Sequence, residues 1–174
     1  MRKKRILIVD HQEDNLSLLG SLLRGHDYEV DEACHGAVAL ELARLAPPDL
    51  VIADIVMPVM HGFVLCRAWK QDEHLQSIPF FFYTSTYTDD QDRAFALSLG
   101  ADQFIVKIED PKVLMAMIRE TLHPVQAAAA SDLLATEATM PDGDYGYLKK
   151  RHNEMWLRGL GAQMPRLDYD HKLR

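Results

Sequence analysis

Four residues with charged or hydroxyl side chains stand at or directly after short apolar runs: Asp10, Asp54, Thr84 and Lys107. Two carboxylates that lie close together repel each other and need a cation in order to stay ionised. Oxygen ligands of this kind suit Mg²⁺, which keeps several waters and leaves room for a phosphate oxygen. A lysine ammonium and a threonine hydroxyl can contact further phosphate oxygens. Gathered at one place, the four residues predict phosphoryl transfer, with the carboxylate of Asp54 as the nucleophile.

Bringing these residues together requires a particular order of secondary structure. In the first 123 residues, apolar runs typical of buried strands alternate with segments of helical spacing. We expect strands at 6–9, 28–33, 50–54, 80–84 and 104–107. We expect helices at 15–24, 37–45, 62–70, 90–99 and 111–122.

This alternation predicts the α/β class, with a five-stranded doubly wound parallel sheet of the flavodoxin-like kind. Ligands bind such sheets at the carboxyl ends of the strands, so the four residues should meet at one edge. Taken singly, each has a simpler explanation. Asp10 and Asp54 could cap the helices that follow them, and Thr84 is a good strand former. These explanations account for the residue types but not for the shared location.

Over residues 5–122 the chain resembles the receiver domain of two-component response regulators. The matching segments are ILIVD at 6–10, PDLVIAD at 48–54, MP at 57–58, MHG at 60–62, YTS at 83–85, GAD at 100–102 and FIVK at 104–107. Each segment alone is a weak signal. Their order along the chain, each at an expected strand end or turn, makes the resemblance specific.

The resemblance implies a role for each strand-end residue. Asp54 would be the phosphoacceptor, and Thr84 and Lys107 would contact the phosphoryl group. The carboxylates of Asp10 and Asp54 and the backbone carbonyl of Val56 would hold Mg²⁺ or Mn²⁺. The phosphoryl donor would be a histidine kinase or a phosphotransfer protein, and phosphorylation would switch partner or dimer contacts. The chain would then be a signalling phosphoacceptor and not an enzyme.

Three further positions bear on switching and on the lifetime of the phosphoryl group. Phe104 falls at the aromatic switch position of the family, which works together with Thr84. Because Phe104 has no hydroxyl, we expect its ring to favour the buried rotamer. Val56 and Thr86 occupy the positions that tune hydrolysis in this family, and neither has a carboxylate or amide to orient water. The phosphorylated form should therefore hydrolyse slowly.

The sequence departs from the family pattern at His11 and Ile108. His11 replaces the usual second acid, and it is either a metal ligand or, as we favour here, the simple loss of an acid for which Glu13 or Asp14 would compensate. Ile108 replaces the usual proline after the lysine. A cis Lys107–Ile108 bond would cost roughly 2.5–4 kcal/mol, so we expect a trans bond. Both departures leave open an alternative, a pseudo-receiver that binds partners without phosphorylation.

Composition excludes several other classes of protein. The 174 residues carry 26 acidic and 19 basic side chains, a net charge of −7, with 48% hydrophobic residues, which is ordinary for a globular chain. Cys34 and Cys66 form no close pair, which argues against a disulfide framework or a zinc site. The longest apolar runs are too short for a signal peptide or a membrane span. We therefore expect a cytoplasmic protein with no membrane partner.

The charge divides the chain into two parts. Residues 124–174 hold seven acids and seven bases, so the net charge of −7 lies entirely in residues 1–123. We expect a receiver domain at 1–123, and a linker and amphipathic helical extension at 124–174 with its helix at 147–160. No helix-turn-helix fits this neutral stretch, so we expect no DNA binding. A homodimer formed through this helix is the hypothesis for the tail.

Overall fold

The computed structural model describes residues 2–107 and 110–123. Their centre is one sheet of five parallel strands in the order β2-β1-β3-β4-β5. The strands are β1 (Arg5–Val9), β2 (Glu29–Ala33), β3 (Leu50–Ala53), β4 (Phe80–Thr84) and β5 (Gln103–Val106). Because consecutive strands are parallel, a helix crosses over between each pair and the polarity of the sheet is uniform. The predicted doubly wound α/β fold is confirmed.

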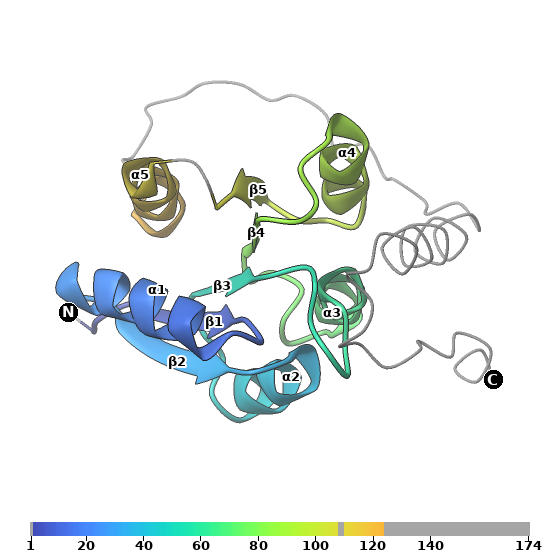
Figure 1. The fold of residues 1–174 in the computed structure, drawn as a ribbon. Helices are drawn as coiled ribbons and strands as arrows, with labels where there is room; N and C mark the ends of the chain where they lie inside the picture. Colours follow the sequence, from blue (N-terminus) through green and yellow to red (C-terminus); the bar gives the residue numbers. More distant parts are fainter. Residues whose placement is uncertain (1, 108–109, 124–174) are drawn as a thin grey trace, which may run out of the picture. The chain divides into compact units, whose positions relative to one another are not determined.

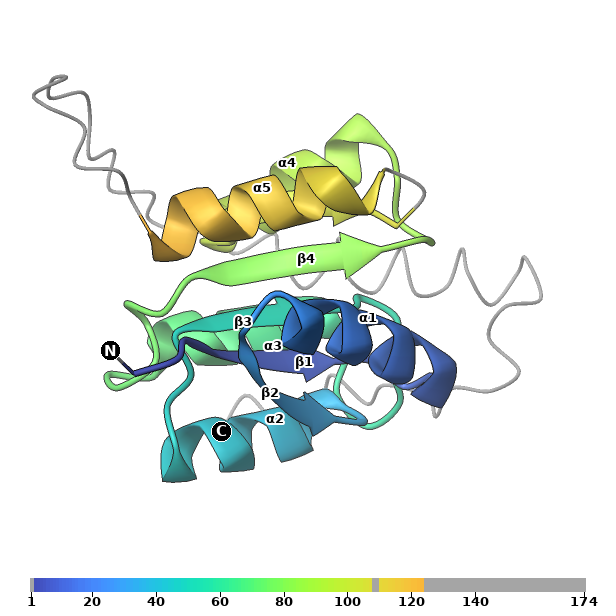
Figure 2. The ribbon, with the colours of Figure 1, turned by 90° about the vertical axis from the view of Figure 1, so that its left-hand side faces the viewer.

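Five helices cover the two faces of the sheet (Figure 1). They are α1 (Glu13–Gly25), α2 (Gly36–Leu45), α3 (Gly62–Gln71), α4 (Asp90–Ser98) and α5 (Pro111–Leu122). Helices α1 and α5 lie on one face, and α2, α3 and α4 lie on the other. The view in Figure 2, turned by 90°, shows the strand arrows running in one direction beneath α1 and α5.

Apolar side chains fill both layers between the sheet and its helices. On β1, Ile6 and Ile8 join the cluster beneath α1 and α5. The pleat turns the alternate residues Leu7 and Val9, which are also buried, to the opposite face. This double burial explains why the central strands read as continuous apolar runs.

The second face is built mainly from aromatic rings. Phe63 of α3 meets Phe82 of β4 at a centroid distance of 5.4 Å and Phe95 of α4 at 5.0 Å, both edge to face. Trp69 meets Phe80 at 5.9 Å in the same manner. Aromatic pairs of this geometry each add about 0.5–1.5 kcal/mol to the effect of burial. The layer fixes α3 and α4 against β4.

Several helix and strand bounds differ from the predicted ones by one or two residues. Helix α1 begins at Glu13 and not at residue 15, because its first turn contains the acids Glu13 and Asp14, which the helix dipole favours. Strand β2 begins at Glu29, because Asp27 turns the chain with a φ of 68° just before it. Strands β3 and β5 each end one residue earlier than predicted, so Asp54 and Lys107 directly follow them.

Some predictions concern residues outside the described part of the chain. The linker and amphipathic helix at 124–174, and the loop at Ile108, belong to this group. Among the described helices, none combines the length and the apolar character that crossing a membrane requires.

The start of α3 approaches the loop after β3 very closely at Gly62. The backbone N–H of Gly62 donates to the carbonyl of Ile55 at 2.7 Å. A Cβ on Gly62 would lie 2.7 Å from the Cα of Ile55 and even closer to the carbonyl oxygen of Asp54. Both neighbours are backbone atoms, so only a residue without a side chain fits here.

We predict that Gly62→Ala lowers the free energy of unfolding by about 1–3 kcal/mol, the usual cost of overpacking. Gly25→Ala is the matched control, because a Cβ there would meet nothing within 4 Å. Urea unfolding of both variants is the measurement. Equal stability of the two variants would contradict the close approach at Gly62.

Candidate functional site

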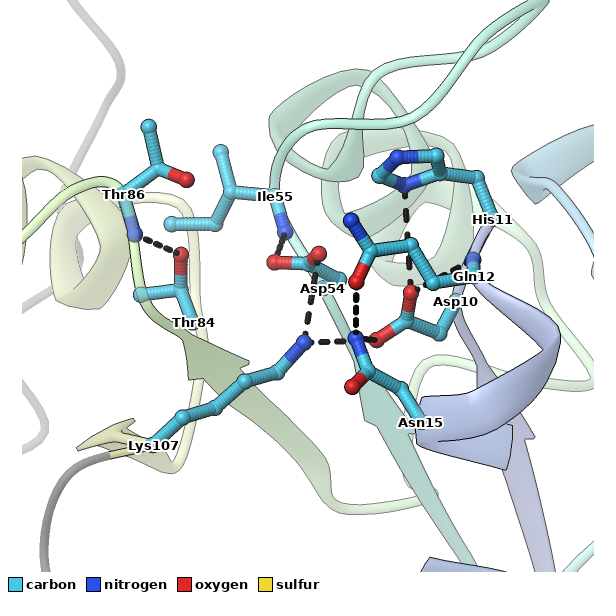
Figure 3. A network of polar contacts seen from close by, with 9 residues as sticks. All are labelled: Asp10, His11, Gln12, Asn15, Asp54, Ile55, Thr84, Thr86 and Lys107. Atoms are coloured by element: carbon cyan, nitrogen blue, oxygen red, sulfur yellow. Dashed lines mark hydrogen bonds and ion pairs between the residues drawn. The ribbon is translucent and has the colours of Figure 1, made fainter. Parts of the chain in front are cut away.

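The four residues singled out in the sequence lie together at the carboxyl edge of the sheet (Figure 3). Backbone hydrogen bonds between neighbouring strands set their positions. The N–H of Asp54 donates to the carbonyl of Val9 at 2.9 Å, which places Asp54 beside Asp10. The N–H of Lys107 donates to the carbonyl of Thr84 at 2.8 Å. The parallel register thus brings together residues that lie 97 positions apart in sequence.

The ammonium group of Lys107 lies between the two carboxylates. Its Nζ is 2.6 Å from Oδ2 of Asp10 and 3.3 Å from Oδ2 of Asp54. The Lys107 side chain is only 14% exposed and that of Asp54 only 6%. One positive charge therefore faces two negative charges in a weakly solvated place, and a net negative charge remains to attract a cation.

Two residues that the sequence analysis missed hold the carboxylate of Asp10. The backbone N–H of Gln12 donates to Oδ1 at 2.9 Å, and Nδ2 of Asn15 donates to Oδ2 at 3.0 Å. The same amide of Asn15 donates to Oε1 of Gln12 at 2.9 Å. Their position around the first turn of the helix that follows the strand is the only sequence signal for them.

Neither aspartate caps the helix that follows it. The N-cap residue of α1 is Gln12, whose side chain makes no capping hydrogen bond. The N-cap residue of α3 is His61, and its Nδ1 accepts a hydrogen bond from the N–H of Phe63 at 3.4 Å. The simpler explanation of Asp10 and Asp54 as helix caps is therefore wrong. Both carboxylates face Lys107 instead.

Burial dominates the electrostatics of Asp54. It raises the pKa of this carboxyl above the ordinary range, and the negative charge of Asp10 raises it further. The ammonium of Lys107 and the N–H of Ile55, which donates to Oδ1 at 2.8 Å, pull the pKa in the opposite direction. The ionised form of Asp54 is therefore costly in the folded chain, and a further cation nearby would stabilise it.

Asp10, His11 and Asp54 form a group that can hold a metal ion. One possible ligand atom from each lies within 4.8 Å of the other two. Two carboxylate oxygens and an imidazole nitrogen are an appropriate donor set for a divalent cation. Glu13 and Asp14 are both exposed and lie outside this group, so they do not replace the missing acid.

The remaining predicted site residues lie in the adjoining loops and strands. Val56 follows Asp54 by two residues with a partly exposed side chain, and its carbonyl as a ligand stays a prediction. Thr84 is fully buried, and its Oγ1 accepts from the N–H of Thr86 at 3.3 Å. Phe104 is 2% exposed, with the guanidinium of Arg93 5.3 Å from the ring centroid. The ring occupies the buried position expected for it.

His61 joins two loops of the site. Its Nε2 lies 3.4 Å from the hydroxyl of Tyr87, and both residues are buried. His61 ends the loop after β3, which contains Asp54, and Tyr87 stands three residues after Thr84. The contact between His61 and Tyr87 therefore connects the loop after β3, which contains Asp54, with the loop after β4, which follows Thr84.

A cavity of about 280 Å³ opens beside the site. Asp10, Asn15, Asp54 and Lys107 contribute its polar lining. Most of the remaining lining is apolar and comes from α1, the adjoining strands and the start of α5: Ile8, Val9, Leu16, Leu18, Leu19, Leu22, Ile52, Tyr83 and Pro111. The carboxylates of Asp10 and Asp54 thus border an open space at the edge of the sheet.

Solved structures similar to this chain are receiver domains. The receiver domain of a signal transduction histidine kinase from Syntrophus aciditrophicus has a TM-score of 0.65 and 31% identity, covering 75% of this chain and 98% of that one. The BeF3-activated N-terminal receiver domain of RstA from Klebsiella pneumoniae has a TM-score of 0.64 and 30% identity, covering 69% and 99%.

Curated relatives give the same result. Response regulator PleD of Caulobacter vibrioides is 38% identical over 115 residues, 66% of this chain and 25% of that protein. The probable transcriptional regulator ycf27 of Porphyridium aerugineum is 32% identical over 149 residues, 86% and 59%. The chain spans between a quarter and three fifths of the length of such relatives. The model of the response regulator receiver domain matches residues 6–119. The chain therefore belongs to the receiver domain family of two-component response regulators.

Proposed function

We propose that the chain accepts a phosphoryl group on the carboxylate of Asp54. The observation that carries this proposal is the position of Asp54 at the strand ends, where Lys107 lies 3.3 Å from its Oδ2 and Asp10 shares the same ammonium. On this proposal the donor is the phosphohistidine of a histidine kinase or of a phosphotransfer protein, the kind of partner with which receivers of this family interact.

The transfer is an exchange of one bond to phosphorus for another. A carboxylate oxygen of Asp54 forms a bond to phosphorus while the bond from phosphorus to the histidine nitrogen breaks, and the leaving imidazole takes up a proton. Lys107 then pairs with an oxygen of the phosphoryl group, and the hydroxyl of Thr84 donates to another. These residues supply position and charge, which is most of what phosphoryl transfer requires from a protein.

A divalent cation completes the site on this proposal. Mg²⁺ or Mn²⁺ bound by Asp10 and Asp54, with the carbonyl of Val56, would neutralise the charge that the phosphoryl oxygens bring. The net negative charge of the two carboxylates and Lys107 supports such a site. Phosphorylation would draw Thr84 toward the phosphoryl group. The side chain of Phe104 would respond to this movement and alter the outer face of β5.

The output of the switch would pass through the tail of the chain. Residues 124–174 would serve as a connector and a dimer contact, and a cytoplasmic location stays a prediction. The expectation of no DNA binding finds no support among the relatives, because one of them carries the name DNA-binding response regulator MtrA, from Mycobacterium leprae, with 34% identity over 121 residues. The chain itself would act as a signalling phosphoacceptor, with its chemistry confined to its own aspartate.

We predict that incubation with acetyl phosphate and Mg²⁺ or Mn²⁺ adds the mass of one phosphoryl group to the chain. Asp54→Asn should abolish this gain, because it removes the nucleophile. Intact-mass spectrometry is the measurement. Asp14→Asn is the matched control, since Asp14 is an exposed acid on the first turn of α1 outside the metal-binding group.

Absence of a mass gain with either metal would contradict the phosphoacceptor proposal and would favour the pseudo-receiver alternative. The same chain would then be tested for partner binding without a phosphodonor. A gain that persists in Asp54→Asn would place the chemistry on another residue and would also contradict the proposal.

We predict that the phosphorylated chain keeps its phosphoryl group for minutes or longer after the donor is removed. Val56 and Thr86 offer no carboxylate or amide to orient an attacking water. Thr86→Glu should shorten the lifetime by roughly a hundredfold, the lower end of general base effects. The time course of the intact mass measures both lifetimes, and a wild-type half-life of seconds would contradict the prediction.

We predict that Asp54→Asn raises the free energy of unfolding near neutral pH in buffer with a chelator. Burial raises the pKa of Asp54, so the unfolded chain releases this proton at a lower pH than the folded chain. The wild type therefore loses stability as pH rises from the ordinary aspartate pKa to the raised one, and the variant does not. Urea unfolding at several pH values should show that the difference in free energy of unfolding between Asp54→Asn and the wild type grows as pH rises. A difference that is constant with pH would contradict the prediction.

A further inference from the structure

We propose that His11 is a metal ligand in this chain, and that it makes the site prefer transition-metal ions that accept nitrogen, such as Co²⁺, over Mg²⁺. The inference concerns the cation of the phosphoacceptor site proposed above and deepens that proposal. Its tests need no phosphorylation, so they can fail or succeed independently of the function of Asp54.

The imidazole of His11 is turned toward the site. His11 is an exposed residue directly after the strand end, with 30% of its side chain exposed, and its Nδ1 lies 3.8 Å from Oδ1 of Asp10. Figure 3 shows the ring beside the carboxylate of Asp10. The imidazole therefore lies on the side of the site where the carboxylate of Asp10 offers a ligand oxygen.

The two carboxylate oxygens of Asp10 have different partners. Lys107 and Asn15 both bind Oδ2, at 2.6 and 3.0 Å. Oδ1 receives only the N–H of Gln12 among the described hydrogen bonds and is the oxygen nearest His11. Because the ammonium lies on the Oδ2 side, the Oδ1 side is where a second cation meets the least repulsion.

The distances among the three donors are short. The ligand atoms of Asp10, His11 and Asp54 lie within 4.8 Å of one another. Metal–ligand bonds of about 2.0–2.2 Å separate donors on opposite sides of an ion by about 4.2 Å. Only one pair of the three donors can lie on opposite sides of an ion, so the side chains would close in on the ion for all three residues to touch it.

The chemistry of the donors favours transition-metal ions. Mg²⁺ prefers oxygen ligands and gives up its waters reluctantly. Replacing a carboxylate by a neutral imidazole removes both an oxygen donor and a negative charge, so it weakens Mg²⁺ binding on two counts. Imidazole nitrogen binds first-row transition ions well, in the order Mn²⁺ < Co²⁺ < Ni²⁺. The substitution therefore changes the selectivity of the site and not only its affinity.

The test compares the full chain with His11→Asp, which restores an acid, by isothermal titration with MgCl₂ and CoCl₂ without a phosphodonor. We expect His11→Asp to bind Mg²⁺ more tightly and to lower the ratio of Co²⁺ to Mg²⁺ affinity by at least about tenfold. His74→Asp makes the same exchange on an exposed residue after the end of α3, at the opposite edge of the sheet, and should leave the ratio unchanged.

Pulsed electron paramagnetic resonance with Mn²⁺ gives an independent result. We expect a nitrogen coupling in the wild type and in His74→Asp, and none in His11→Asp. His11→Asn supplies an amide oxygen in place of the nitrogen and repeats the test if His11→Asp does not fold. Failure of the wild type to bind Co²⁺, an unchanged affinity ratio or a missing nitrogen coupling would overturn the inference.

Each proposal can fail without the other. Phosphorylation of Asp54 in Mg²⁺ with an unchanged affinity ratio would leave the phosphoacceptor standing and would remove the role of His11. Binding of Co²⁺ that depends on His11, in a chain that gains no phosphoryl mass, would leave the metal site standing and would contradict the phosphoacceptor.

Discussion

The repulsion between two buried carboxylates, Asp10 and Asp54, is the constraint on which the rest of the site depends. The sheet places them at the ends of neighbouring central strands, where both are buried and where burial penalises the charge of Asp54. Lys107 offsets part of this cost by contacting both oxygens at 2.6 and 3.3 Å. One ammonium cannot balance two carboxylates, so the site keeps a demand for positive charge that a metal ion can meet, and such an ion can in turn bind an oxygen of a phosphoryl group.

The scaffold makes this costly arrangement possible because its own stability comes from elsewhere. The apolar layer beneath α1 and α5 and the aromatic layer around Phe63 bury side chains worth roughly 1.5–3 kcal/mol each. The glycine at position 62 lets α3 start directly against the loop of Asp54, and the pair His61 and Tyr87 links that loop to the one after β4. Rigid packing thus keeps the two carboxylates close together in spite of their repulsion.

Much of this arrangement could be predicted from the sequence, because it depends on patterns that extend over many residues. The apolar runs predicted the sheet, and the sheet predicted that Asp10, Asp54, Thr84 and Lys107 would meet. The role of Asn15 could not be predicted, since it rests on a single side-chain rotamer at the start of α1, and that of Gln12 rests on the direction of its backbone N–H, which its residue type does not reveal. The same holds for the direction of the His11 ring, on which the proposed role of this residue as a metal ligand rests.

The central claim is that Asp54 carries the phosphoryl group as an acyl phosphate. Borohydride reduction tests it most directly, because it converts an aspartyl phosphate to homoserine and leaves a free aspartate unchanged. After treatment with acetyl phosphate and then with borohydride, peptide mass spectrometry should find homoserine at position 54. Homoserine at another position, or its absence from a chain that has gained phosphoryl mass, would contradict the account.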